Sequence, residues 1–367
     1  MKNLSGTDKS RLNYLDMAKG IGIIFVIICH TGFVGEPIRR FFGSFHMPLF
    51  FAVSGILLFV KRESERPLKE IVLKKLRTIM LPYLCFSVLD IVIYAVCSLI
   101  YGQEGIFSNV LLAVRKTITF YGHSVLWFLP AFFIAEIVFI ALLKRLSLWS
   151  FVAVPAIAAL AFLLHKELLS AGGAYGDSFL FAVFSDFLIA LIRAMICLVF
   201  VAAGYALAYM MKNIFKSDTG NDNPVIGALT GIALLVATFF ISRKNGNTDL
   251  NLCVFSNVFL YYPAAVSGSF GLILICKAME KISNKGIFRP IIYFGINSLI
   301  VMVTHLDFYL LYFAESISLR IVTYVSRGKV YVLNFLVLAF VLMAEAVLIE
   351  IINRFFPVLI GKRRRHN

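Results

Sequence analysis

The sequence predicts an all-α polytopic membrane protein, with about ten transmembrane helices in one bundle and both termini on the cytoplasmic side. Hydrophobic residues make up 60% of its 367 residues, and the mean hydropathy is +0.89. Charged residues make up only 15%, against about 25% in typical soluble domains. Apolar runs of about 20 residues, the length that crosses a bilayer, recur along the whole chain. These observations argue against a soluble multidomain protein.

Each predicted span is an apolar run between polar segments. The runs cover residues 14–34, 44–60, 80–101, 125–143, 148–164, 185–211, 225–242, 257–277, 291–313 and 330–356. Barrel strands are excluded, because they would be about ten residues long with strict alternation. The eighth span is the least regular, since residues 247–257 are polar and turn-like, so nine or eleven spans remain alternatives. We expect one domain, 1–367, with a short basic tail at 361–367.

The formal net charge of +15 is distributed over alternate loops. If the N-terminus is inside, the cytoplasmic segments hold about twice as many Lys and Arg residues as the external ones. This bias is typical of membrane insertion, so no nucleic-acid partner is needed to explain it. The first run carries Asp16 and Lys19 and lacks a small-x-small cleavage site before Phe33, which indicates an uncleaved first span.

The six cysteines are scattered, most of them within apolar runs. They form no Cys-x-x-Cys pair and no metal-ligand spacing, so we expect neither a metal site nor a bound cofactor. They are typical of small buried hydrophobic residues.

Ionisable residues within the predicted spans are costly unless they pair or line a wet cavity, so they are candidates for function. They are Asp16, Lys19, His30, His46, Asp90, Glu136, Asp186, Arg193, His305, Asp307, Glu345 and Glu350. For Arg193, Glu345 and Glu350 we favour structural ion pairs, for instance Arg193 with Asp90 or Glu136.

The first span carries a polar stripe. Lys19 and His30 are eleven residues apart, so on a helix they lie within roughly 20° of one another, about 16 Å apart along the axis. Asp16 shares this face and can pair with the amine of Lys19. The stripe predicts a tunnel in which an extended ligand places anionic groups near Lys19 and its reactive end near His30. Coenzyme A has this shape, and an imidazole can accept and return a hydroxyl proton.

Two further segments carry candidate residues. The loop after the second span is crowded with basic side chains, among them Lys74, Lys75 and Arg77. They either hold the phosphates of coenzyme A or reflect the cytoplasmic bias and anionic lipid headgroups. In the ninth span Ser298 and His305 are seven residues apart and share a face, with Asn297 next to them.

Several motifs, in this order, resemble the membrane-bound acyltransferase family 3, and most closely its fucose acetylase-like branch. They are Leu15-Asp-x-x-Lys-Gly-Ile-Gly-Ile with His30, Phe45-His-Met-Pro-Leu-Phe-Phe-x-x-Ser-Gly55, Leu76-Arg-x-x-x-Leu-Pro-Tyr83, Leu126-Trp-Phe-Leu-Pro-Ala-Phe-Phe133 with Glu136, and Gly295-x-Asn-Ser-Leu299 with His305. The resemblance spans about residues 11–356. Lys19 stands where the family pattern has an arginine, so the charge is kept and the planar fork is lost.

The resemblance implies an enzyme of the bacterial inner membrane that moves an acyl group, expected to be acetyl, from acyl-coenzyme A to a sugar hydroxyl. The acceptor would be a lipid-linked or surface polysaccharide. His30 is the expected general base, with a covalent acyl-histidine as the alternative, and Lys19 with Asp16 completes the catalytic set. His46, Glu136, Asn297, Ser298 and His305 would shape the acceptor side, and Lys74, Lys75 and Arg77 would bind the donor phosphates.

Two other functions fit an intramembrane set of carboxylates and histidines. A transporter or flippase of glycan precursors predicts matching halves with broken helices, and we find no internal repeat. A non-catalytic assembly factor for a glycan synthase predicts that changing His30, His46 and His305 has no effect on phenotype.

Overall fold

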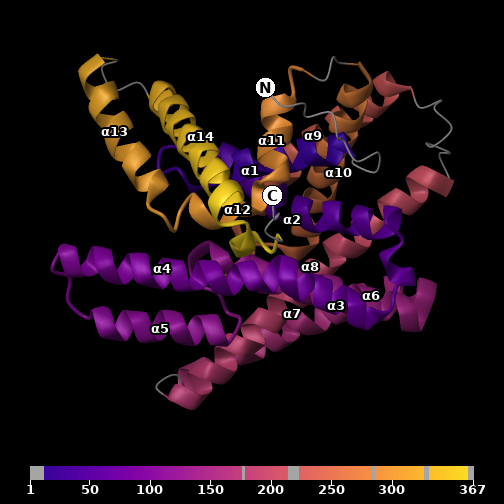
Figure 1. The fold of residues 1–367 in the computed structure, drawn as a ribbon. Coiled ribbons are helices and arrows are strands. Elements are labelled where there is room, and N and C mark those ends of the chain that lie inside the picture. Colours follow the sequence, from indigo (N-terminus) through magenta and orange to yellow (C-terminus); the bar gives the residue numbers. More distant parts are fainter. Residues whose placement is uncertain (1–11, 176–177, 214–222, 283–285, 326–329, 363–367) are drawn as a thin grey trace.

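The computed structural model describes residues 12–175, 178–213, 223–282, 286–325 and 330–362. Its fold is helical throughout, apart from one short hairpin (Figure 1). The long helices are α1 Asn13–His30, α2 Glu36–Val60, α4 Leu81–Ile100, α6 Phe128–Leu146, α7 Ser150–Tyr175, α8 Phe179–Asn213, α9 Pro224–Asn245, α10 Val258–Ile282 and α14 Val330–Phe355. The shorter helices are α3 Leu68–Lys75, α5 Ile106–Ile118, α11 Arg289–Ile296, α12 Ser298–Thr304 and α13 Leu310–Val325. The remaining elements are the 3₁₀ segments η1 Glu63–Glu65, η3 Ser124–Trp127, η4 Ser147–Trp149 and η6 Pro357–Ile360, the π-helical η2 Leu76–Met80, and the strands β1 Thr248–Asp249 and β2 Val254–Phe255.

The expected number of about ten spans stays a prediction. Among the described residues, eight apolar stretches are long enough to span a membrane. One of them, Ser124–Gly172, is 49 residues long and contains α6 and most of α7. The predicted ninth span corresponds to the broken segment α11–α12, whose helices are too short to count among the eight. The chain is therefore a multi-pass helical membrane protein.

The ninth span is not the continuous helix that the apolar run at 291–313 predicts. The helix ends at Ile296, where Asn297 has φ −104° and ψ 16° and its side-chain amide donates to the carbonyl of Tyr293. After α12 the chain turns again through Tyr309, which has a positive φ of 57°. Short helical pieces thus place His305 at a bend, where its side chain can reach a neighbouring helix.

Glycines bring the central helices into close contact. A Cβ atom at Gly295 of α11 would overlap the carbonyl oxygen of Asp16 in α1, and one at Gly20 would overlap the carbonyl of Ile291. Such small residues let helix backbones approach one another in membranes. As a result α1 lies inside the bundle, and its polar stripe does not face lipid.

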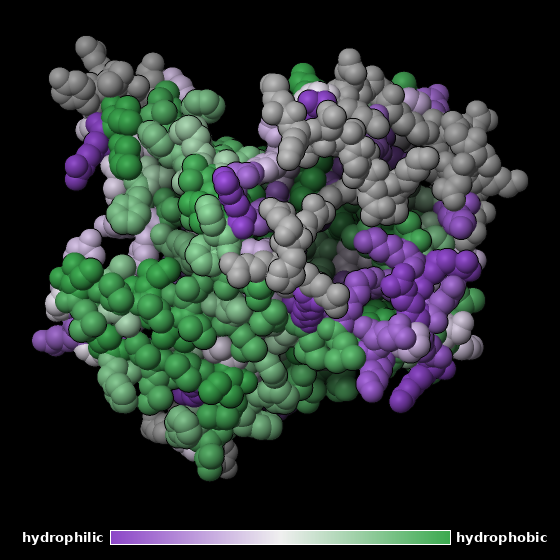
Figure 2. Space-filling view, viewed as in Figure 1, coloured by the Kyte–Doolittle hydropathy of each residue, from purple (hydrophilic) through white to green (hydrophobic). Residues whose placement is uncertain are grey.

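The exterior matches a membrane environment. Large apolar side chains along α4 and α5 are exposed, and Figure 2 shows this face as a continuous apolar surface. Hydrophilic side chains gather instead over the connection between α2 and α3 (Figure 2). Apolar contact with lipid replaces the polar exterior of a soluble domain.

The first and last described helices begin and end on the same side of the bundle. Asn353 in the last turns of α14 donates to Asn297 at 3.0 Å, next to the α11–α1 contact at Gly295. Lys362 donates to Asn353 at 2.6 Å. Both ends of the described chain therefore lie beside the start of α1, as an even number of passes requires. The rest of the predicted basic tail, 363–367, lies outside the described residues.

Candidate active site

The polar stripe of α1 opens into two separate cavities. Lys19, paired with Asp16 at 2.8 Å, lies at one, and His30 lies at the other. We call them the inner pocket and the outer pocket. Since the helix rises about 1.5 Å per residue, the two residues are about 16 Å apart along α1.

The inner pocket has a volume of about 420 Å³ and lies between α1, α2, α3, α6 and α12. Its charged and polar lining consists of Lys19, Ser54, Lys61, Glu63, Lys74, Lys75, Thr78, Glu136 and Ser298. Lysines outnumber carboxylates in this set, so the pocket has an excess of positive charge. That excess suits a ligand with phosphate groups.

A network of ion pairs organises these lysines. Lys75 contacts Glu136 at 2.7 Å and Glu63 at 3.6 Å, and Lys74 contacts Glu63 at 2.5 Å. The Ser54 hydroxyl also donates to Glu136. The side chain of Lys75 is only 10% exposed, whereas that of Lys74 is 50% exposed. Lys75 is therefore committed to protein partners, and Lys74 remains accessible to a ligand.

Lys61 differs from the other inner-pocket lysines, because no carboxylate of the described residues lies within ion-pair distance of it. Burial and the neighbouring charges of Lys74 and Lys19 lower the pKa of Lys61. Burial alone would raise the pKa of Glu63, but the hydrogen bond from Lys74 and the charge of Lys75 outweigh it and lower that pKa. The site thus holds an ionised carboxylate and a lysine whose charge an anionic ligand would stabilise.

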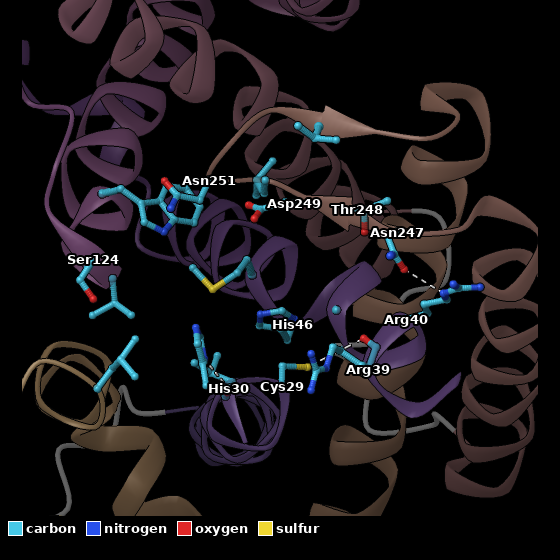
Figure 3. Close-up of a pocket in the computed structure, with 18 of the residues that line it drawn as sticks. Cys29, His30, Arg39, Arg40, His46, Ser124, Asn247, Thr248, Asp249 and Asn251 are labelled. Atoms are coloured by element: carbon cyan, nitrogen blue, oxygen red, sulfur yellow. Dashed lines mark hydrogen bonds between the residues drawn. The ribbon is translucent and has the colours of Figure 1, made fainter. Parts of the chain in front are cut away.

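The outer pocket has a volume of about 530 Å³ and is rich in polar side chains (Figure 3). Helices α1 and α2 contribute Cys29, His30, Glu36, Arg39, Arg40 and His46, η3 contributes Ser124 and Trp127, and the β1–β2 hairpin contributes Asn247, Thr248, Asp249 and Asn251. Figure 3 shows His30 and His46 on one side of the cavity and the hairpin residues on the opposite side. Polar side chains and the indole ring of Trp127 thus line the same cavity.

The two pockets share one lining residue. Met302 of α12 lines both of them, and the two residues at the junction of η3 and α6 divide between them, with Trp127 on the outer pocket and Phe128 on the inner. A flexible methionine thus stands between the lysine-rich cavity and the one that holds His30. A thin ligand arm that displaced it would connect the two sides.

Hydrogen bonds fix the tautomers of the three histidines. The Nδ1 atoms of His30, His46 and His305 lie 2.8, 2.9 and 2.8 Å from the carbonyl oxygens four residues earlier in the chain. Because a carbonyl oxygen can only accept, each Nδ1 carries a proton, and the neutral ring has its lone pair on Nε2. His30 is exposed to the outer pocket, so its Nε2 is available to a ligand.

His305 packs directly against His30. Their ring centroids are 5.1 Å apart, with the planes inclined at 63°. His305 is completely buried, and its Nε2 has no hydrogen-bond partner among the described residues. This neighbour limits the orientations that the His30 ring can adopt.

Arg193 does not form the expected ion pair with Asp90 or Glu136. It is fully buried in α8, and its guanidinium donates to the carbonyls of Asn251 at 2.5 Å and Tyr121 at 2.6 Å. The ring of Tyr121 stacks on it at 4.2 Å. One carbonyl belongs to the hairpin that lines the outer pocket, and the other to the loop just before η3. Arg193 therefore holds these two segments in place relative to each other.

The other predicted ion pairs of the membrane interior were also wrong. Glu345 accepts a hydrogen bond from Thr304, and Glu350 accepts one from Tyr293. Asp90 pairs with His123 at 2.8 Å. Hydroxyls and imidazoles thus take the place of the cations that we expected beside these carboxylates.

The predicted site residues divide between the pockets in a way that the sequence did not indicate. Glu136 and Ser298, expected beside the acceptor, line the inner pocket with Lys19. Glu136 lies about 12 Å along α6 from Phe128, which places it well inside the bundle. Asn297 is buried against Asn353 and lines neither pocket, and Arg77 lies in η2 outside both linings.

Sequence reasoning missed most of the outer pocket. The sequence predicted only loop residues at Arg39, Arg40 and the β1–β2 hairpin. It gave no reason to distinguish Met302 from other apolar residues of its span. A polar stretch at 247–257 next to a span was the only local signal for the hairpin. Its approach to α1 and α2 depends on contacts between segments about 200 residues apart, such as Arg40 with Asn247 at 2.9 Å.

Comparison with known proteins gives one match. The sequence model of the acyltransferase domain that defines acyltransferase family 3 matches residues 12–352, nearly the whole chain. No curated protein and no solved structure matches it. The matched region contains both pockets and every side chain that lines them. The chain therefore belongs to acyltransferase family 3.

Proposed function

We propose that this protein is an O-acyltransferase that moves an acyl group, expected to be acetyl, from acyl-coenzyme A to a sugar hydroxyl. The observation that carries the proposal is the pair of pockets on α1. A lysine-rich cavity at Lys19 meets, at Met302, a polar cavity that exposes Nε2 of His30. A donor with phosphates at one end and a thioester at the other fits this arrangement.

The donor phosphates belong in the inner pocket. Lys61 has no carboxylate within ion-pair distance among the described residues. The side chains of Lys74 and Lys19 are 50% and 22% exposed to solvent. These three lysines are better placed for phosphate than Lys75, whose charge Glu136 and Glu63 neutralise. The excess of Lys and Arg on this side supports a cytosolic orientation of the pocket, where coenzyme A is supplied.

The distance along α1 separates the roles of Lys19 and His30. A group that acts on the reacting atoms must lie within hydrogen-bond reach of them, about 3 Å. Lys19 lies about 16 Å from His30 along the axis, beyond the reach of its side chain. Lys19 therefore holds the anionic end of the donor, and Asp16 keeps its amine in place.

His30 then acts as the general base. Its Nε2 takes the proton from the sugar hydroxyl, and the oxygen attacks the thioester carbonyl. As the tetrahedral intermediate collapses, the carbon–sulfur bond breaks and the coenzyme A sulfur takes the proton from Nε2. The Nδ1–H bond to Val26 holds the ring in the required tautomer, and His305 limits its rotation.

The acceptor enters the outer pocket. Trp127, Asn247 and Asn251 offer an aromatic face and amide groups typical of sugar recognition, and His46 lies across the cavity from the two asparagines (Figure 3). A lipid-linked or surface polysaccharide, presented at the outer side of a bacterial inner membrane, is the proposed acceptor. Surrounding membrane lipids are the remaining partners, and the fucose acetylase-like branch stays a prediction.

The test is replacement of His30 by Ala, with mass spectrometry of the surface glycan. We expect the acyl mass to disappear while the glycan itself is retained. His165→Asn, a change in α7 at a residue that lines neither pocket, serves as the control for loss of a histidine. Normal acylation by the His30→Ala variant at normal protein level would refute the proposal.

The same experiment separates the enzyme from a flippase. A flippase without its key residue would leave the glycan missing from the surface, not merely unacylated.

The second variant pair concerns Lys19. We expect Lys19→Arg to retain more activity than Lys19→Ala, because only the former keeps the charge; equal activity in both would remove Lys19 from donor binding.

A further inference from the structure

Arg39 is a cation of the outer pocket that lacks a carboxylate partner among the described residues. Its Nη2 donates to the carbonyl of Thr31 at 3.0 Å, whereas its Nε is shielded from solvent and has no hydrogen-bond partner in the described part of the chain. Its neighbour Arg40 differs, since Arg40 contacts Glu36 at 3.4 Å and Asn247 at 2.9 Å. The charge of Arg39 is therefore left for a ligand to neutralise.

The carboxylates that line the outer pocket do not compensate Arg39. Glu36 is paired with Arg40. Asp249 accepts a hydrogen bond from the backbone of Leu252 at 3.0 Å, and it forms no ion pair with any residue that the structure describes. An uncompensated guanidinium with a shielded Nε–H is costly at the edge of a membrane domain. An anion bound beside it would lower that cost.

The position of Arg39 connects it to the reaction. Thr31, whose carbonyl anchors the guanidinium, directly follows His30 in the chain. Figure 3 shows Arg39 beside Cys29, on the side of the cavity that also holds His30 and His46. An anion on Arg39 would therefore lie next to the hydroxyl that His30 deprotonates.

We propose that Arg39 forms a subsite for an anionic group, a carboxylate or a phosphate, on the acceptor glycan. This inference rests on the proposed function, because it defines the class of acceptor. The acylated sugar then carries such a group itself or is directly linked to one. Arginine suits this task, since its planar fork binds carboxylate and phosphate with two parallel hydrogen bonds.

Direct binding tests the subsite without any catalysis. Purified protein in nanodiscs is titrated with an oligosaccharide that ends in glucuronate, with its carboxyl-reduced counterpart that ends in glucose, and with glucose 1-phosphate. We expect one or both anions to bind about 10- to 100-fold more tightly than the neutral sugar. The preference between carboxylate and phosphate identifies the source of the charge.

Two variants locate that preference. Arg39→Gln should reduce it to within a few-fold of unity. Arg243→Gln, which removes an exposed positive charge on α9 that does not line the pocket, should leave it intact. The proposal would be overturned if the wild type bound the three probes equally or bound none of them. It would also be overturned if Arg39→Gln kept the wild-type preference for the anion.

Kinetics distinguish the subsite from a role at the reacting carbonyl. With a charged acceptor, Arg39→Gln should raise KM and leave kcat within a few-fold; a loss in kcat alone would overturn the subsite. A wild type that prefers the anion but transfers no acyl group would keep the subsite and refute the proposed function. A wild type that acylates charged and neutral glycans equally well would keep the proposed function and refute the subsite.

Discussion

The ion pair between Lys75 and Glu136 permits a quantitative test of how the inner pocket is built. Both side chains are nearly buried, at 10% and 4% exposure, and their charged atoms are 2.7 Å apart. Removing one partner of a buried pair costs about 3–5 kcal/mol, because the other charge is left uncompensated. For Glu136→Gln we expect about 3 kcal/mol, the lower limit, because Glu63 lies 3.6 Å from Lys75 and retains part of the compensation.

The double variant shows whether this cost comes from the stranded charge. Lys75→Met alone leaves Glu136 with the Ser54 hydroxyl as its only partner among the described residues, so we expect a loss of about 3–5 kcal/mol. Replacing both partners removes both charges, and the double variant should be more stable than either single one. The coupling energy in the cycle should therefore exceed the larger of the two single losses, which is about 3–5 kcal/mol.

Unfolding in mild detergent, followed by denaturant titration for all four proteins under identical conditions, gives the free energies. Coenzyme A affinity, measured on the same samples, separates structure from ligand binding. We expect the double variant to bind coenzyme A within a few-fold of wild type. Additive single effects would refute the ion-pair reasoning, and a loss of affinity in the stable double variant would make Lys75 a phosphate ligand after all.

Three more predictions concern packing, charge and passage. Gly55→Ala should cost about 1–3 kcal/mol in unfolding experiments, since its Cβ would overlap the backbone of Val201 in α8, whereas Gly43→Ala, with open space around it, should be neutral or stabilising. Coenzyme A affinity should fall as pH rises through the pKa of Lys61, which lies below the ordinary 10.5, because the phosphates bind the protonated amine. The Lys61→Arg variant should show a weaker dependence of affinity on pH. The same pH dependence in this variant would remove Lys61 from the donor site. Met302→Trp should block acyl transfer and leave coenzyme A binding within a few-fold; full activity would contradict a passage at this residue.

Local sequence patterns predicted the membrane passes and the stripe on α1. Apolar run length and the 3.6-residue period depend on neighbours in the chain, so they are readable without a structure. Lys19 and His30 were placed on one face by their spacing alone, and the structure has them at two pockets that meet.

Features that depend on distant segments were not predictable in this way. The break at Asn297 lies in a run whose apolar character continues on both sides, so hydropathy gives no sign of it. Arg193 was assigned a carboxylate partner because charge is the property visible in a sequence. The carbonyls of Tyr121 and Asn251 that it binds are present in every residue and carry no such signal.

The outer pocket shows the same limit. Its polar wall comes from a hairpin after α9 that reaches helices near the start of the chain, as in the contact of Arg40 with Asn247. Arg39 counted in the sequence only as an external loop charge. Its importance follows from which atoms are satisfied around it, and that is a property of the folded chain.

The most direct measurement is a structure of this protein with a non-hydrolysable acetyl-coenzyme A analogue. We predict phosphates beside Lys19, Lys61 and Lys74 and a pantetheine arm that passes Met302. The thioester should lie close enough to His30 that an acceptor oxygen between them can contact both the thioester carbonyl carbon and Nε2 of His30. A donor that lies wholly in the outer pocket, or one whose thioester ends in the inner pocket away from His30, would contradict the account.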